Sequence, residues 1–244
     1  MSGPDGVHFG LVELDLLATH AGVRFPFPLR VPEFGRIDGE REVLLAAAGV
    51  TLRSRGLAGE RGPLGVAAEV VTALREHRGT VDLVLTTSGA AVGVVAVVYR
   101  SWALICRQSL TGDLAANGVR VRRVAQTVLA EELVALVPAV ASAVTMPITL
   151  PPDGRDPAVV DELGRLLPEI TGAGQLGASS RGARAGAELS WLDGPRGRVR
   201  TNRTADGWVS VNSLQQNELR YALNDMAMTA RREHDGSATV ARAV

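Results

Sequence analysis

Three runs of β-branched and bulky apolar residues follow one another in the middle of the chain, and they limit the possible folds more than any other feature. They read VDLVLTT at 81–87, VGVVAVVYR at 92–100 and WALICRQS at 102–109. The connections between them are a Ser-Gly pair and a turn near Arg100 and Ser101. Short connections between such runs are typical of paired antiparallel strands. The pattern therefore predicts a three-stranded meander.

Helical periodicity precedes this meander. A short strand followed by a helix is expected across 8–22, and three prolines then impose an extended path on residues 26–32. An amphipathic helix is predicted over 38–55, with Asp38 as a possible N-cap, and a second helix occupies the segment between Pro63 and Gly79.

The pattern after the meander predicts a second group of strands and helices. Residues 119–121 could add a fourth strand, a choice between strand and helix stays open for 123–128, and LAEELVALVP at 129–138 is helical. The proline-rich segment 147–157 is the best internal boundary, and a helix is expected from Asp156 to about Leu167.

The rest of the second half repeats the order of a meander followed by a helix. The Gly/Ala/Ser/Arg segment 171–186 carries little apolar mass and is predicted to be a flexible loop in which Gly174 tolerates alanine. AELSWLD, GRVRTNRT and GWVSV then predict strands with Asp-Gly turns, and Ser213 with Gln216 forms a capping box for a last helix.

These elements predict an α+β fold, with a central and mainly antiparallel sheet flanked by helices in two pseudo-symmetric halves. The N-terminal half covers 1–150 and the C-terminal half 151–244, and together they are expected to form one compact domain. With 46% hydrophobic but only 4% aromatic residues, the core must consist mainly of Val, Leu and Ala.

Charge and apolar patterning exclude several classes of partner. The 26 basic and 26 acidic residues cancel, and the arginines are dispersed, so nucleic acid is not an expected partner. The N-terminus has no signal-peptide profile, and the longest apolar run, at 90–98, is about half the length that spans a bilayer. We therefore expect a soluble cytoplasmic protein without membrane insertion.

The spacing G-x-G-x-x-G at Gly172, Gly174 and Gly177 raises the alternative of a small-molecule or nucleotide-binding enzyme that uses the 172–177 glycine loop. The context argues against it. A dinucleotide fingerprint needs a buried strand before it and a helix after it, whereas a helical segment precedes this one and more glycines follow. Three such glycines can occur by chance in a chain that has 27.

No catalytic or metal-binding set is readable. The four histidines, His8, His20, His77 and His234, are scattered without metal-ligand spacing, and the lone Cys106 lies in an apolar run that favours a buried structural thiol. We therefore expect no cofactor and no metal, and a binding protein is favoured over an enzyme.

Several strings, in this order and spacing, resemble the EspG family, the cytosolic chaperones of actinobacterial type VII (ESX) secretion systems. VELDLLATHAGVRFPFPLRVP at 12–32 is similar to the family's Glu-Leu entry and its proline-bounded segment. EREVLLAAAGVTLRSRGL at 40–57 resembles the next helix with its Arg-Gly-Leu end, and GRVRTNRTADGWVSVNS at 197–213 resembles the closing strand pair. The likeness covers most of 9–230 and is weakest between 150 and 186.

The resemblance implies a non-enzymatic chaperone. Such a protein binds the helical tip of a PPE-like protein in a PE/PPE heterodimer, keeps the pair soluble and directs it to the secretion machinery. The family's client-gripping regions correspond to the first turn of the meander and the second-half helical segment. The candidate partner-binding residues are Thr87, Ser88, Gly89, Ala90, Leu163, Leu166, Leu167 and Ile170. A plain β-turn and ordinary core residues are the alternative for these positions. The client, the secretion subtype and the oligomeric state are not readable from the sequence.

Overall fold

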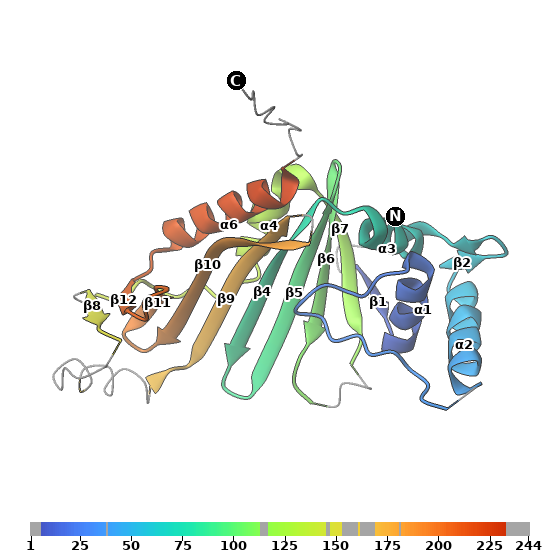
Figure 1. Ribbon diagram of the computed structural model, residues 1–244, viewed down its shortest axis with the longest axis horizontal. Coiled ribbons are helices and arrows are strands. Elements are labelled where there is room, and N and C mark those ends of the chain that lie inside the picture. Colours follow the sequence, from blue (N-terminus) through green and yellow to red (C-terminus); the bar gives the residue numbers. More distant parts are fainter. Residues whose placement is uncertain are drawn as a thin grey trace, which may run out of the picture.

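A ten-stranded antiparallel sheet forms the centre of the protein in the computed structural model, which describes residues 6–37, 39–112, 117–144, 147–152, 161, 169–180 and 182–232. The spatial order is β1-β7-β6-β5-β4-β9-β10-β11-β12-β8 (Figure 1). The strands are β1 Val7–Phe9, β4 Gly79–Thr87, β5 Ala90–Tyr99, β6 Trp102–Ser109, β7 Val119–Ala125, β8 Ile148–Leu150, β9 Gly172–Ser180, β10 Ala183–Gly194, β11 Gly197–Arg203 and β12 Val209–Ser213. The α+β prediction with a large antiparallel sheet is confirmed.

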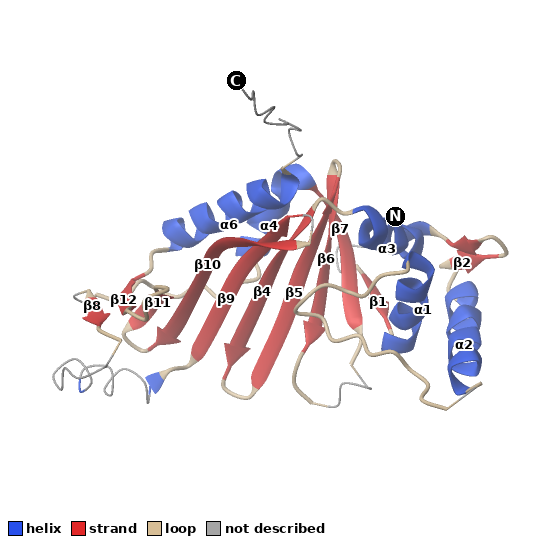
Figure 2. Ribbon diagram, in the orientation of Figure 1, coloured by secondary structure: helices blue, strands red, loops and turns tan. Residues whose placement is uncertain are grey.

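Helices lie on both faces of this sheet (Figure 2). They are α1 Leu11–Ala21, α2 Glu40–Ser54, α3 Gly65–Glu76, α4 Leu129–Val134 and α6 Gln216–Arg231. A small hairpin, β2 Ala58–Gly59 with β3 Gly62–Pro63, connects α2 to α3. The helices predicted over 38–55 and after Pro63 are thus present as α2 and α3, while Asp38 lies outside the described residues.

The predicted meander is the middle of the sheet. β4 and β5 pair from Gly79↔Val98 to Thr87↔Ala90, and β5 pairs with β6 down to Tyr99↔Trp102. Because side chains alternate along a strand, a central strand can contribute to a core on each face of the sheet. On β5, for example, Val94 and Ala96 lie in one core while Val95 and Val97 lie in the other.

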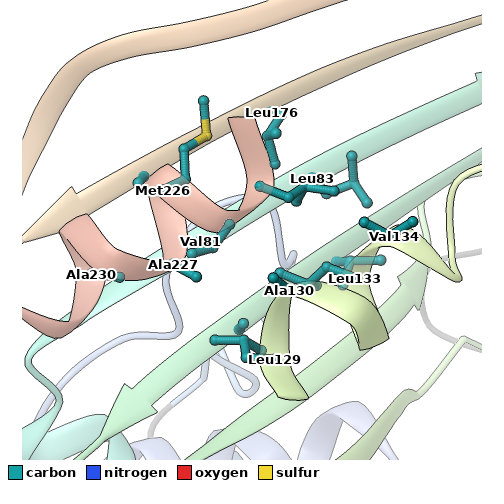
Figure 3. Close-up of a cluster of buried hydrophobic side chains, with 14 of the residues drawn as sticks. Val81, Leu83, Leu129, Ala130, Leu133, Val134, Leu176, Met226, Ala227 and Ala230 are labelled. Atoms are coloured by element: carbon teal, nitrogen blue, oxygen red, sulfur yellow. The ribbon is translucent and has the colours of Figure 1, made fainter. Parts of the chain in front are cut away.

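One face of the sheet packs against α4 and α6. Figure 3 shows side chains of the two helices directed toward the strands, with Ala227 of α6 close to Val81 of β4. Leu176 from β9 joins the same cluster, and all of these side chains are buried. Full burial of a Leu or Val stabilises the fold by roughly 1.5–3 kcal/mol relative to exposure, so this core unites β4 and β9.

The other face packs against α1 and α3, over the part of the sheet made by β1, β5, β6 and β7. Phe9, Leu14 and Leu17 are completely buried there. The proline-bounded segment then crosses this face, where the side chain of Gln108 accepts a bond from Arg30 N at 2.7 Å and donates to Arg30 O at 2.9 Å. The Phe27–Pro28 peptide bond is cis.

The prediction of a flexible loop over 171–186 is wrong. Residues 172–180 form β9, which pairs with β4 on one side and β10 on the other, and β10 begins at Ala183. The segment has few large apolar residues of its own, which is why the sequence predicts a loop. In the structure, large side chains of β10 fill the space above the small residues of β9. Trp191 lies over Gly174, and the Arg184 guanidinium lies over Gly177.

Three smaller expectations have definite outcomes. The open choice over 123–128 resolves into strand to Ala125 and a 3-10 turn over Gln126–Val128. The capping box of the last helix is formed by Gln215 and Glu218, two residues after the predicted pair of Ser213 and Gln216, because β12 continues through Ser213. The helix expected at 156–167 falls almost wholly outside the described residues.

Candidate partner-binding site

The turn between β4 and β5 projects from the end of the sheet at which β4 ends and β5 begins. We call this end of the strands the β4–β5 edge. Thr87 and Ala90 form the last pair of the ladder, and Ser88 and Gly89 make the two-residue connection. Gly89 has φ 85°, a left-handed conformation that suits glycine in a tight hairpin. All four residues are exposed, so the turn presents a small, uncharged tip to solvent.

A second predicted residue lies beside this turn. Gly172, at the start of β9, pairs with Thr87, so Ile170 lies two residues from the tip of the neighbouring strand. Ile170 is half-buried. The following residue, Thr171, donates its N–H to Asp193 O at 2.8 Å and its hydroxyl to the same oxygen at 3.2 Å. The approach to β9 is therefore held against the end of β10.

A buried ion pair supports that end of β10. Arg198 is 0% exposed, and its Nε and Nη2 donate to Asp193 Oδ1 and Oδ2 at 2.6 and 2.9 Å. The same guanidinium donates to Pro138 O at 2.9 Å and lies 5.4 Å from the ring centroid of Trp191. Bidentate contact with a planar fork fixes direction as well as distance. The turn between β10 and β11 is thus rigidly attached to the core.

The local pattern places Arg198 in the strand-like run GRVRTNRT and does not distinguish it from the other arginines of that run. A signal was present, because Asp193 and Arg198 lie on either side of a short hairpin connection. The turn itself is at Pro195 and Arg196, and the Asp193-Gly194 pair predicted to form it belongs to β10. Residues at those positions are opposite each other across the ladder, as the pairing Asp193↔Arg198 shows.

The sheet surface next to this edge is partly open. Between the turn and the middle of the sheet, Thr86 and Gln175 are exposed, and Val84, Ala173 and Leu192 are half-buried. Their pairing places them on one face, the face opposite α4 and α6 and toward the viewer in Figure 1. A partner at the β4–β5 turn could therefore extend onto this surface.

The predicted site residues fall into two groups, those that the structure brings together and those that lie outside the described residues. The structure brings Thr87, Ser88, Gly89 and Ala90 next to Ile170 at the β4–β5 edge. Leu163, Leu166 and Leu167 lie outside the described residues. Contact of any of these positions with a partner stays a prediction.

The glycine motif is not built to bind a phosphate. Gly172, Gly174 and Gly177 lie within an interior strand, where they pair with Thr87, Leu85 and Asp82 of β4 and with Asp193, Trp191 and Glu188 of β10. A phosphate cradle needs free backbone N–H groups at a loop or helix N-terminus. The ladder on both sides uses the backbone of this strand, which contradicts the nucleotide-binding alternative.

The buried carboxyl group of Asp82 also has a structural role. Asp82 is 2% exposed and forms an ion pair with Arg184, which reaches across β9. Burial raises the pKa of the Asp82 carboxyl, and the hydrogen bond from Arg184 offsets only part of that effect. Burial likewise raises the pKa of the Cys106 thiol to about 12, which makes it inert as a nucleophile at neutral pH.

Across the described part of the chain, no group of three or more His, Cys, Asp or Glu side chains is placed to hold a metal ion. No helix among those residues is long and apolar enough to cross a bilayer.

Comparisons with known proteins agree with this architecture. The model of the EspG family matches residues 11–225. Among solved structures, the chain is similar to the Mycobacterium tuberculosis type VII secretion system chaperone EspG5, solved in complex with a PE25–PPE41 dimer. That match has a TM-score of 0.62 and 13% identity and covers 91% of this chain and 96% of EspG5. No curated protein matches.

Proposed function

The chain belongs to the EspG family, and from this premise we propose that it is a cytosolic chaperone of a type VII (ESX) secretion system. Its client is a PPE-like protein in a PE/PPE heterodimer, held by its helical tip. The chaperone keeps the pair soluble and directs it to the secretion machinery. It acts by binding and not by catalysis.

The observation that carries this proposal is the family match over residues 11–225. EspG5, which shares the fold, was solved with a PE25–PPE41 dimer, and this supports the same class of client here. The physical benefit is plain. A helical tip with exposed apolar side chains is prone to aggregation, and a chaperone that covers it removes that liability.

We place the client contact at the edge formed by Thr87 to Ala90 and Ile170. These residues are uncharged and exposed or half-buried, so apolar side chains can dock without removing a charge from water. Rigid support comes from the Asp193–Arg198 pair beneath the edge. The edge is therefore ready to bind without a large ordering cost.

Co-expression with candidate PE/PPE pairs tests the function. We expect a stoichiometric soluble complex of three chains on size-exclusion chromatography. If no such pair binds and a nucleotide raises the melting temperature, the chaperone function is wrong.

The contact surface has its own test. Ser88→Arg places a long charged side chain at the turn and should weaken client binding by at least about tenfold, the ratio that corresponds to 1.4 kcal/mol. Ser101→Arg is the matched control, because Ser101 is an exposed residue of the turn between β5 and β6, at the opposite end of the strands. Equal affinity for the two variants would move the contact elsewhere while leaving the chaperone function intact.

We also propose that 1–150 and 151–244 are related halves of one compact domain. Two series of strands extend outward from the β4–β9 pair in opposite directions. One runs β4-β5-β6-β7 and the other runs β9-β10-β11-β12. Each series is followed by a helix, α4 or α6, and both helices pack in one core. This arrangement is what a pseudo-twofold between β4 and β9 would produce.

A further inference from the structure

The outer face of α2 is apolar but exposed. Val43 and Val50 are 69% and 59% exposed, and Ala46 and Ala47 between them are exposed as well. In a helix with 3.6 residues per turn, positions i, i+3, i+4 and i+7 lie along one side. These four residues therefore form one continuous stripe, which we call the α2 stripe.

The stripe faces away from the rest of the chain. Ala48 and Leu52 are the buried residues of α2, and they lie on the opposite side of the helix from Val43 and Val50. Figure 1 shows α2 at the end of the molecule beyond α1, far from the β4–β5 turn. An ordinary surface helix carries polar residues on its outer side, so this one has the composition of a helix covered on both sides.

The inner side of α2 is firmly fixed. Arg41 donates to both carboxylate oxygens of Asp15 at 2.8 and 2.9 Å, and Arg55, just after the helix, donates to both oxygens of Glu13 at 2.8 Å. These two carboxylates belong to α1 and are buried. Rolling α2 over to bury the stripe would break both pairs, so the chain cannot cover the stripe by rotating this helix.

The pattern of the stripe is complementary to itself in the antiparallel direction. If a second α2 runs antiparallel to the first, with the twofold axis between Ala46 and Ala47, then Val43 of each copy meets Val50 of the other. The small alanines at the centre allow the two backbones to approach closely. The contact is isologous, since the same residues serve both copies.

The flanking charges agree with this register. Glu42 and Arg53 are exposed and lie on the same flank of the stripe, near opposite ends of the helix. In an antiparallel pair, residues on one flank of the first helix face the same flank of the second, so each Glu42 lies near an Arg53 of the other copy. Opposite charges in these positions favour this register. In a parallel pair each flank would instead face the other flank of the partner, so Glu42 and Arg53 would not meet.

From these observations we propose that the protein self-associates through α2, forming an antiparallel twofold dimer over the α2 stripe. The occupant of the stripe is a second copy of this chain. This goes beyond the proposed function and leaves the β4–β5 turn of both copies free for a client.

The dimer is expected to be weak. A 15-residue helix is about 22 Å long, so a single helix pair buries less than the ~1,600 Å² of a standard stable interface. Monomer and dimer should therefore exchange within an accessible concentration range. Sedimentation velocity of the full chain, from about 1 to 200 µM, should show the weight-average mass rising toward the dimer value.

Substitutions in the stripe test the assignment. Val50→Glu introduces two carboxylates into the twofold contact and should shift dissociation to at least about tenfold higher concentration. Met228→Glu is the matched control, because Met228 is an apolar residue on the outer side of α6 with 53% exposure. It should leave self-association unchanged. Both sites are exposed, and circular dichroism should confirm an unaltered fold.

Charge reversal tests the register. Glu42→Arg alone and Arg53→Glu alone each place like charges on one flank and should dissociate the dimer. An equimolar mixture of the two variants restores opposite charges in both pairs and should dimerise again as a heterodimer. The proposal is overturned if the wild type stays monomeric at 200 µM, if Val50→Glu and Met228→Glu associate equally well, or if the mixture fails to recover.

Discussion

Single residues of β10 explain how a glycine-rich segment can be an interior strand. A Cβ at Gly174 would lie 2.0 Å from Trp191 Cζ2, and one at Gly177 would lie 2.1 Å from a guanidinium nitrogen of Arg184. The indole and the guanidinium thus occupy the volume that side chains of β9 would otherwise need. Local propensity places glycine in loops. The residues that allow glycine in this strand lie later in the chain, since Trp191 is 17 positions after Gly174 and Arg184 is 7 positions after Gly177.

Gly174→Ala should therefore destabilise the protein. The added methyl group has to displace Trp191, which is 1% exposed and packed in the main core. Overpacking of this kind costs about 1–3 kcal/mol. Urea denaturation of the variant should show a lower midpoint with an unchanged slope.

Gly186→Ala is the control for that substitution. Gly186 is an exposed residue of β10 with nothing within 4 Å of an added Cβ. Its stability should change by less than about 0.5 kcal/mol, as is usual for surface sites. If the two variants were equally stable, the tight packing of Trp191 on β9 would be wrong.

At the scale of elements, α2 depends on charged contacts more than on apolar burial. Only Ala48 and Leu52 are buried in this helix. Glu13, by contrast, is a buried carboxylate that accepts bonds from Arg55 and from the N–H of Gly10, both at 2.8 Å. Arg55 also donates to His8 O at 2.5 Å. One arginine thus joins the end of α2 to β1 and to the start of α1.

Arg55→Ala should loosen this junction. The variant leaves a buried carboxylate with one backbone partner, a loss that costs about 1–3 kcal/mol. Hydrogen exchange should become faster throughout α2, while the amides of β4 and β5 stay protected. Arg24→Ala is the control, since the Arg24–Glu33 pair is largely exposed and such pairs contribute less than about 1 kcal/mol. If α2 exchanged equally fast in the two variants, the local role of Arg55 would be contradicted.

The elements differ in how far their sequence reveals them. The first meander was predictable because Val-rich runs alternate with two-residue turns, and β6 matches its expected bounds of 102–109. The β4–β5 turn of the candidate site followed from the same pattern. β9 was missed because its stability derives from Trp191 and Arg184. The pairing of Thr87 with Gly172 brings Ile170 to the turn. The two paired residues are 85 positions apart in the chain, so patterns within a short stretch of sequence cannot predict that they meet.

At the scale of the whole molecule, the β4–β9 pair joins the two halves. The two strands pair at nine positions, from Gly79↔Ser180 to Thr87↔Gly172. Behind them, side chains from both halves share one core, including Val81 and Leu83 from the first half and Leu176 and Ala227 from the second. β8, at the end of the first half, pairs with β12 in the second. Neither half closes its sheet or its core without the other.

Separating the halves should therefore abolish folding of each. Residues 1–150 expressed alone would expose the long β4 edge and the apolar face that α6 covers, and we expect aggregation. Residues 151–244 alone should give no cooperative thermal transition. Co-expression of the two fragments should restore a soluble 1:1 complex, because the shared core and the nine-position ladder supply their association.

A protease site inserted after Pro152 provides the matched control. Cleavage of the folded protein there should leave the fragments together on size-exclusion chromatography, with far-ultraviolet circular dichroism unchanged. Urea unfolding of the cut protein should become dependent on protein concentration, since the ends are no longer tethered. If fragment 1–150 alone is monomeric and unfolds cooperatively, the halves are independent domains and the shared core is not what holds the molecule together.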